Sequence, residues 1–184
     1  MKLDHKLLAL VAVSMVALGA LAAVFKPAEH AADLERLRSR ALQVPVQAFD
    51  ASKLTDSYLQ SRQAGARTHE ALDIPAPVGT PVVAVEDGRV EKLFLSKPGG
   101  ITVYQFDPRS EFAYYYAHLD RYADGLKEGA AVKRGDVIGY VGTSGNAAGG
   151  APHLHFAVFR LGPEHQWWRG TPLNPFLLWR DAAH

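Results

Sequence analysis

The stretch HLHFAVF, residues 153–159, alternates between two kinds of side chain. Its second, fourth and sixth residues are large and apolar, and its two histidines stand beside them at the first and third positions. Because successive side chains of a β-strand point to opposite faces, we expect a strand with one apolar face. His153 and His155 then share the other face, ~7 Å apart along the strand.

Five further short runs are rich in β-branched and aromatic residues, at 82–85, 89–95, 101–106, 112–117 and 137–141. Turn-forming pairs such as Asp87-Gly88 and Asp107-Pro108 separate them. No stretch with the length and periodicity of a crossover helix lies between these runs, which excludes a parallel β-α-β architecture. The sequence therefore predicts an all-β fold, an antiparallel sandwich or a partly open barrel.

Residues 7–25, LLALVAVSMVALGALAAVF, contain no charged residue over 19 positions. As a helix they would extend ~28 Å, close to the ~30 Å hydrocarbon core of a bilayer. We therefore expect residues 1–26 to form a membrane helix that contacts the lipid bilayer through 7–25, and the rest of a single-pass inner-membrane protein to lie in the periplasm. The small residues Ala20 and Ala22 keep the alternative open, a cleaved signal and a secreted or periplasmic product.

Residues 28–42 have apolar side chains at helical spacing, at Ala31, Leu34, Leu37 and Ala41. Acidic residues come early in this stretch and arginines come late, which suits the dipole of a helix. The spacing predicts a short stalk helix. We expect residues 27–59 to contain this helix and a lead-in, and residues 60–180 to form the folded domain.

The composition limits what the chain can bind. Its 184 residues are 48% apolar, enough for one domain with a hydrophobic core. The 20 Lys and Arg residues balance 19 Asp and Glu residues, which argues against a nucleic-acid partner held by bulk electrostatics. Because the chain has 0 cysteines, any metal must be held by histidine and carboxylate side chains.

The segment HEALD, residues 69–73, nearly reproduces the helical HExxH zinc motif. Its fifth residue is an aspartate, and Pro75 and Pro77 follow, so a helix is not expected to continue here. In a loop that enters a strand, His69 and Asp73 can converge as one nitrogen and one carboxylate ligand. A fourth histidine, His118, ends the aromatic run within YAHL, where on its own it would be a structural residue.

Several motifs together resemble the lysostaphin-type, or LytM-type, zinc metallo-endopeptidases of bacterial cell walls. In chain order they are RTH at 67–69, Asp73, GTPV at 79–82, DG at 87–88, YAHL at 116–119, GTSG at 142–145 and HLHF at 153–156. The resemblance covers about residues 60–161. It departs from the family pattern at Ala71, where glycine is usual, and this leaves every ligand position intact.

The resemblance implies a zinc ion held by His69, Asp73 and His155, with His118 and His153 as the catalytic pair. It also implies a two-layer antiparallel β fold of the barrel-sandwich hybrid type, with a groove over the metal. Three nitrogen and oxygen ligands would leave zinc a fourth position for water, whose pKa can fall from 15.7 to ~7. Two histidines suit the proton transfers and charge stabilisation that amide hydrolysis needs.

The implied function is hydrolysis of peptide cross-links in peptidoglycan. In an envelope with thin peptidoglycan the expected bond joins D-Ala to diaminopimelate, and polyglycine bridges are the alternative. A second interpretation is a catalytically silent LytM-like domain that activates another wall hydrolase, with a regulatory envelope protein as its partner. Silent relatives typically lack ligands, and none is missing here. Trp167, Trp168 and Trp179 could stack on glycan, although core packing is the commoner use.

Overall fold

The computed structural model describes residues 27–62 and 67–180. The predicted membrane segment, residues 7–25, lies outside them. Among the residues that are described, no helix is both long and apolar enough to cross a membrane.

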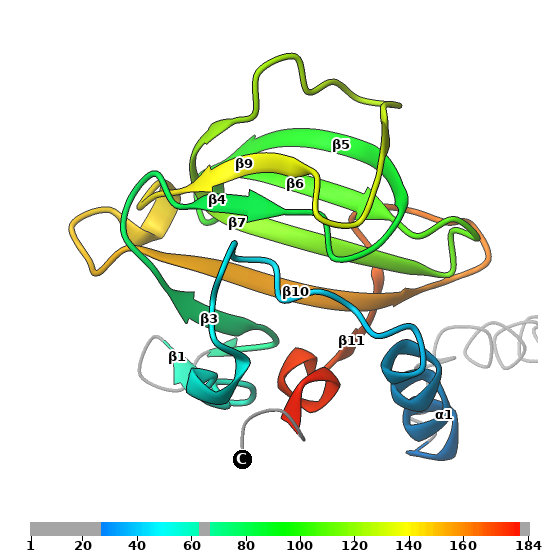
Figure 1. The fold of residues 1–184 in the computed structure, drawn as a ribbon. Helices are drawn as coiled ribbons and strands as arrows, with labels where there is room; N and C mark the ends of the chain where they lie inside the picture. Colours follow the sequence, from blue (N-terminus) through cyan, green and yellow to red (C-terminus); the bar gives the residue numbers. More distant parts are fainter. Residues whose placement is uncertain (1–26, 63–66, 181–184) are drawn as a thin grey trace, which may run out of the picture.

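Strands dominate the described chain (Figure 1). A small hairpin is formed by β1 (Ser61–Arg62) and β2 (Arg67–Thr68). The other strands are β3 (Leu72–Pro75), β4 (Pro81–Val83), β5 (Gly88–Ser96), β6 (Gly100–Phe106), β7 (Phe112–Tyr122), β8 (Ala131–Val132), β9 (Val137–Val141), β10 (His153–Leu161) and β11 (Gly170–Leu173). These nine form one sheet, whose main path is β11-β10-β7-β6-β5-β8. All its pairings are antiparallel, which confirms the predicted antiparallel β architecture.

The long strand β7 joins two layers of this sheet. Its first half pairs with β6 and β10, whereas its end, from Leu119 to Tyr122, pairs with β9. The antiparallel pair of β4 and β9 therefore folds over the main sheet. Val82 and Ile138 from this pair share one buried hydrophobic cluster with Tyr116 of β7 and Phe156 of β10.

The alternation in β10 is confirmed. Leu154, Phe156 and Val158 are fully buried at 0% exposure, and they face the hydrophobic cluster. His153 and His155 are half-buried on the other face. The strand has neighbours on both edges, because β7 pairs with one edge and β3 and β11 pair with successive parts of the other. This central position fixes both histidines in a rigid part of the sheet.

Two short strands, β3 and β11, pair with the outer edge of β10. The strand that the sequence predicted after the loop at 69–73 is β3, whereas β11 was not among the predicted runs. Both are four residues long and contain a proline, Pro75 in β3 and Pro172 in β11. Proline cannot donate a hydrogen bond to a neighbouring strand, so it occurs at edges.

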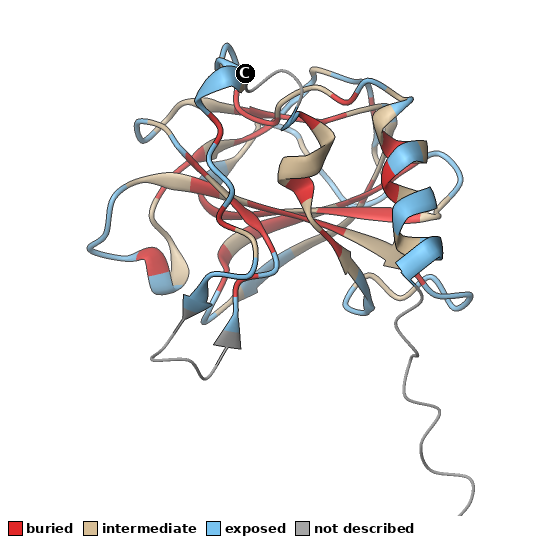
Figure 2. Cartoon of the chain, turned by 90° about the horizontal axis from the view of Figure 1, so that it is seen from below, coloured by how far each residue is buried: buried red, intermediate tan, exposed pale blue. Residues whose placement is uncertain are grey.

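The predicted stalk is a helix, α1, which runs from Pro27 to Arg38 and ends before residue 42. It does not stand apart from the domain. Leu34 and Leu37 lie on one side of the helix and are buried in the main hydrophobic cluster, which removes this apolar side from water. Figure 2 shows buried residues along the strands and exposed residues on the outer turns of α1.

Short 3-10 helices connect the remaining segments. They are η1 (Ala51–Lys53), η3 (Gly145–Ala147) and η4 (Pro175–Leu178). After α1 the chain continues across the domain, where Val46 forms an isolated bridge with Val82. The indole Nε1 of Trp179, just after η4, donates to the Leu42 carbonyl at 2.8 Å. The lead-in is therefore packed onto the β domain, as α1 is.

Candidate metal centre

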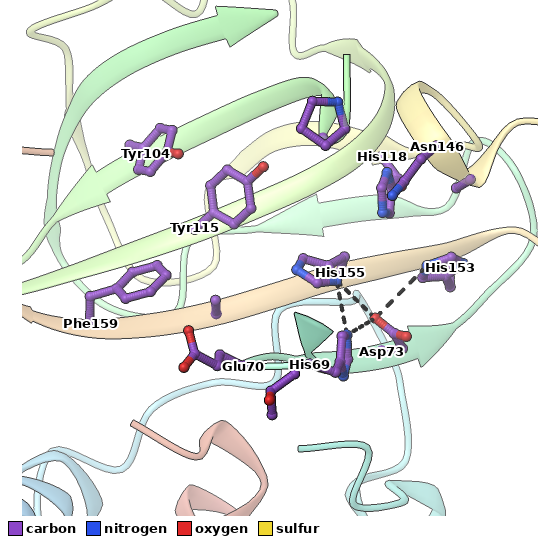
Figure 3. Close-up of a pocket in the computed structure, with 15 residues that line it drawn as sticks. His69, Glu70, Asp73, Tyr104, Tyr115, His118, Asn146, His153, His155 and Phe159 are labelled. Atoms are coloured by element: carbon purple, nitrogen blue, oxygen red, sulfur yellow. Dashed lines mark hydrogen bonds and ion pairs between the residues drawn. The ribbon is translucent and has the colours of Figure 1, made fainter. Parts of the chain in front are cut away.

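Three side chains from separate elements meet at the edge of the sheet (Figure 3). His69 follows β2, Asp73 lies in β3 and His155 lies in β10 directly opposite Asp73 in the strand register. His69 Nε2 is 3.0 Å from Asp73 Oδ1 and 3.1 Å from His155 Nδ1. His155 Nδ1 is 3.0 Å from Asp73 Oδ1. Two nitrogens and one oxygen thus form a nearly equilateral triangle.

This triangle fits a zinc ion. At zinc bond lengths of ~2.0–2.1 Å, tetrahedral donors stand roughly 3.3 Å apart, close to the observed separations. The donor set of two imidazoles and one carboxylate is typical of zinc sites that keep one position open for water. The three residues are those that the family resemblance implied as ligands.

Ser57 supports two of the three residues from behind. Its carbonyl oxygen accepts a hydrogen bond from His69 Nδ1 at 2.7 Å, and its hydroxyl accepts one from the Asp73 amide at 2.9 Å. The first bond requires a proton on Nδ1, so neutral His69 presents the Nε2 lone pair to the cluster. No sequence pattern indicated this role, because Ser57 lies in the lead-in and reaches the site only through tertiary folding.

The protonation states suit a cation. Burial acts to raise the pKa of Asp73, but its contacts with the imidazoles of His155 and His69 hold that pKa well below its usual range. Burial lowers the pKa of His155, although the bond to Asp73 opposes this effect. An ionised carboxylate and neutral imidazoles are the forms that bind metal.

His118 and His153 lie next to this cluster. Their ring centroids are 5.1 Å apart, and the centroid of His118 is 5.4 Å from that of His155. His153 Nε2 is 3.9 Å from Asp73 Oδ1, so this nitrogen faces the cluster. The two residues implied as the catalytic pair are therefore brought together beside the three implied ligands.

Backbone carbonyls fix both of these rings. His118 Nδ1 donates to the carbonyl of Ser144 at 2.8 Å, and His153 Nδ1 donates to that of Ala151 at 2.9 Å. In the neutral form each ring thus carries its lone pair on Nε2. Burial, reinforced by the neighbouring His155, lowers the pKa of His118 to about 4, so it is neutral at pH 7.

The backbone at His118 has φ +61°, a conformation that residues other than glycine rarely adopt. Its amide donates to the Gly99 carbonyl at 2.9 Å. Ser144 also fixes this corner through its hydroxyl, which accepts from the Ile101 amide at 2.9 Å and donates to the Leu119 carbonyl at 2.6 Å. His118 thus lies at an irregular point of β7, where the register with β6 shifts, and these hydrogen bonds set the position of its ring.

The five residues open into a cleft of about 490 Å³. Tyr104, Tyr115 and Phe159 form one wall along the sheet, and Asn146 lies on the opposite side beside His118 (Figure 3). Tyr115 is the wall residue of the aromatic run, whereas Tyr114 and Tyr116 are core residues at 0% exposure. The cleft therefore reaches from the metal cluster to the side chains of Tyr104 and Phe159.

Residues 67–175 match Peptidase family M23. The chain is 36% identical over 108 residues to an L-Ala--D-Glu endopeptidase of Bacillus subtilis, a match that covers 56% of this chain and 33% of that protein. It is 39% identical over 90 residues to the peptidoglycan DD-endopeptidase ShyC of Vibrio cholerae, covering 49% and 20% respectively. The chain therefore spans a third or less of the length of these relatives.

Solved structures show the same fold. The chain resembles the antimicrobial peptidase lysostaphin from Staphylococcus simulans with a TM-score of 0.58 and 26% identity, over 72% of this chain and 51% of the other. It resembles a zinc-containing peptidase from Vibrio cholerae with a TM-score of 0.59 and 27% identity, over 79% and 40%. The family match covers more than half of the sequence and all five site residues. The chain therefore belongs to peptidase family M23.

Proposed function

We propose that this chain is a zinc-dependent endopeptidase that hydrolyses peptide cross-links in bacterial peptidoglycan. The observation that carries the proposal is the meeting of five side chains in one open cleft. His69, Asp73 and His155 form a complete donor set for a metal, and His118 and His153 lie beside it with their Nδ1 atoms already engaged.

A zinc ion held by His69, Asp73 and His155 would supply Lewis acidity, enough to bring the pKa of a bound water to ~7 and to polarise a carbonyl. His153 Nε2 faces the cluster and is placed to accept a proton or to hydrogen-bond the reacting oxygen. His118, neutral at pH 7, is placed to exchange a proton with the departing amine. Both rings present Nε2, so either histidine can perform either proton transfer.

Peptidoglycan as the substrate class is supported by the relatives. Their names describe cleavage of an L-Ala–D-Glu bond in one protein and a DD bond in another. For this chain we propose the D-Ala to diaminopimelate cross-link. We also propose that residues 7–25 anchor it in the inner membrane, which would confine hydrolysis to wall near the bilayer.

The test is release of soluble fragments from dye-labelled sacculi by the full-length chain. We expect release that a chelator abolishes and added zinc restores. His118→Ala should release little, whereas His30→Ala, which removes a histidine of α1 outside the cleft, should match the unmodified chain. A chain that binds zinc but releases nothing would instead be a silent domain, and the assay should then be repeated with a partner hydrolase to detect activation.

A further inference from the structure

A row of aromatic side chains leads away from the metal cluster along the open face of the sheet. It begins at Tyr115, whose ring centroid is 6.0 Å from that of His155 (Figure 3). Tyr104, the cross-strand partner of Tyr115, follows at 4.6 Å. Trp167, from the loop between β10 and β11, lies 4.8 Å from Tyr104. The catalytic cleft is thus continuous with this loop.

The row ends at the surface. Phe94 and Trp168 each lie 5.3 Å from Trp167, measured between ring centroids. Trp168 is 62% exposed and Phe94 is 38% exposed. Phe94 and Trp168 both expose aromatic surface next to Trp167, and contiguous exposed apolar patches mark binding sites. We call Phe94, Trp167 and Trp168 the aromatic platform.

The platform is held in place. His165 Nδ1, in the same loop, donates to the Ser110 carbonyl at 2.6 Å, and the Arg169 amide donates to the Gln166 carbonyl at 3.1 Å. Trp167 is half-buried, because it packs against a buried cluster that includes Leu161 and contacts both Phe94 and Tyr104. A ligand would therefore find the rings already ordered, which reduces the entropic cost of binding.

We propose that the aromatic platform binds sugar rings of the glycan strand while the attached peptide occupies the cleft. The proposal rests on the proposed function, since it assigns a second contact with the same substrate. Each sugar ring has an apolar face of C–H groups and a hydroxylated edge. Tryptophan matches this surface with a flat apolar ring and an N–H donor.

The position of the platform favours glycan over other ligands. The platform shares one sheet face with the proposed metal centre and is joined to it by Tyr104 and Tyr115, so one polymer can contact both. In peptidoglycan every cross-linked peptide is attached to a glycan strand. A ligand that reaches the cleft therefore brings sugar rings with it.

The test compares two substrates with the full-length chain. Trp168→Ala should slow hydrolysis of intact sacculi about 3- to 10-fold, the effect of losing one aromatic contact. Hydrolysis of a glycan-free cross-linked peptide should be unchanged. The control is Leu95→Ala, which removes an apolar side chain that is 72% exposed on the opposite face of β5 from Phe94. It should alter neither rate by more than about twofold.

Two outcomes of this comparison would overturn the proposal. Equal losses on both substrates would show that Trp168 acts on the peptide. Unchanged hydrolysis of sacculi would show that the platform contacts nothing during the reaction. Because Trp168 is mostly exposed, its replacement should leave the fold intact, and Trp168→Phe, which retains a flat ring, should recover part of the rate.

A binding measurement separates this proposal from the proposed function. Calorimetric titration with peptide-free glycan strands should give a heat of binding with the unmodified chain and with His118→Ala, and a weaker one with Trp168→Ala. This result would stand even if no hydrolysis were found. Binding to lipid vesicles that depends on Trp168, without binding to glycan strands, would assign the platform to the membrane and contradict the proposal.

Discussion

At the residue scale, the candidate site depends on contacts that hold each imidazole in one tautomer. The backbone carbonyls of Ser57 and Ser144 each accept the Nδ1 proton of a histidine, His69 in one case and His118 in the other. The family resemblance predicted the five site residues. Its motifs contained Ser144 only within GTSG and did not include Ser57, because the role of both serines comes from carbonyl positions that only the folded backbone defines.

The ligand assignment predicts a loss of metal. His155→Ala should leave the purified chain with little bound zinc, because two donors rarely hold the ion as three do. Elemental analysis of the full-length variant and of the unmodified chain measures this directly. Stoichiometric zinc in His155→Ala would show that His155 is not a ligand. Zinc lost from His153→Ala but kept in His155→Ala would show that the two roles are exchanged.

The catalytic assignment predicts the opposite pattern at the neighbouring histidines. His118→Ala and His153→Ala should keep their zinc and lose ~10²–10⁴-fold in the rate of hydrolysis, the usual effect of removing a positioned acid or base. The two losses should be less than additive in the double variant, since both rings act on one transition state. Steady-state rates on labelled sacculi, measured with matched zinc content, check both points. Nearly full activity in either single variant would remove that histidine from the reaction.

At the element scale, β10 shows which parts of the fold the sequence could predict. Its alternating pattern predicted β10 itself. The runs at 101–106 and 112–117, which have strong β propensity, correspond to the central strands β6 and β7. The predicted run 137–141 coincides with β9. The edge strands β3 and β11 are short and contain proline, so the local sequence did not define the bounds of β3 and did not indicate β11. Their pairing with β10 depends on distant partners, which no local pattern reveals.

Helix α1 shows the same limit for packing. The spacing of apolar residues predicted a helix, but it did not indicate what the apolar side contacts. Leu37 is fully buried. Arg40, just after the helix, forms ion pairs with Glu86 at 2.9 Å and Asp107 at 3.0 Å. Asp107 is buried, so this pairing ties the end of the helix to the β domain.

We therefore predict that α1 contributes to the stability of the β domain. Leu37→Ala should lower the free energy of unfolding by ~2–5 kcal/mol, the usual cost of a cavity at a buried leucine. Leu95→Ala is the matched control, since its side chain is 72% exposed, and its effect should stay within about 0.5 kcal/mol. Urea denaturation of both variants gives the comparison. Equal free energies of unfolding for Leu37→Ala and Leu95→Ala would show that α1 does not stabilise the β domain.

At the scale of the whole molecule, the site assembles because the sheet brings distant segments together. His69 and Asp73 precede His155 by more than 80 residues, and the direct pairing of Asp73 with His155 closes the cluster. The motifs indicated which residues meet. The aromatic platform was not predicted as a unit, because Phe94 and Trp167 come from segments whose contact is purely tertiary.

The membrane anchor is a prediction about the whole chain that comes from sequence alone. Protease added to spheroplasts should digest the β domain, and the N-terminus of the mature protein should still contain Leu7. The physical reason is that 19 residues without a charge are unstable in water and stable as a helix in lipid. A soluble product that begins near Ala23 would contradict the anchor and indicate a cleaved signal.

The measurement that tests the central claim most directly is mass spectrometry of the fragments that the zinc-loaded, full-length chain releases from purified sacculi. Hydrolysis of a peptide cross-link predicts soluble glycan strands with intact sugar chains that carry uncross-linked peptides, each broken amide bond adding the mass of one water. His118→Ala, loaded with the same amount of zinc, should release none. Cleaved glycosidic bonds, or no new fragments from a zinc-loaded chain, would contradict the assignment of this cleft as a peptidoglycan endopeptidase.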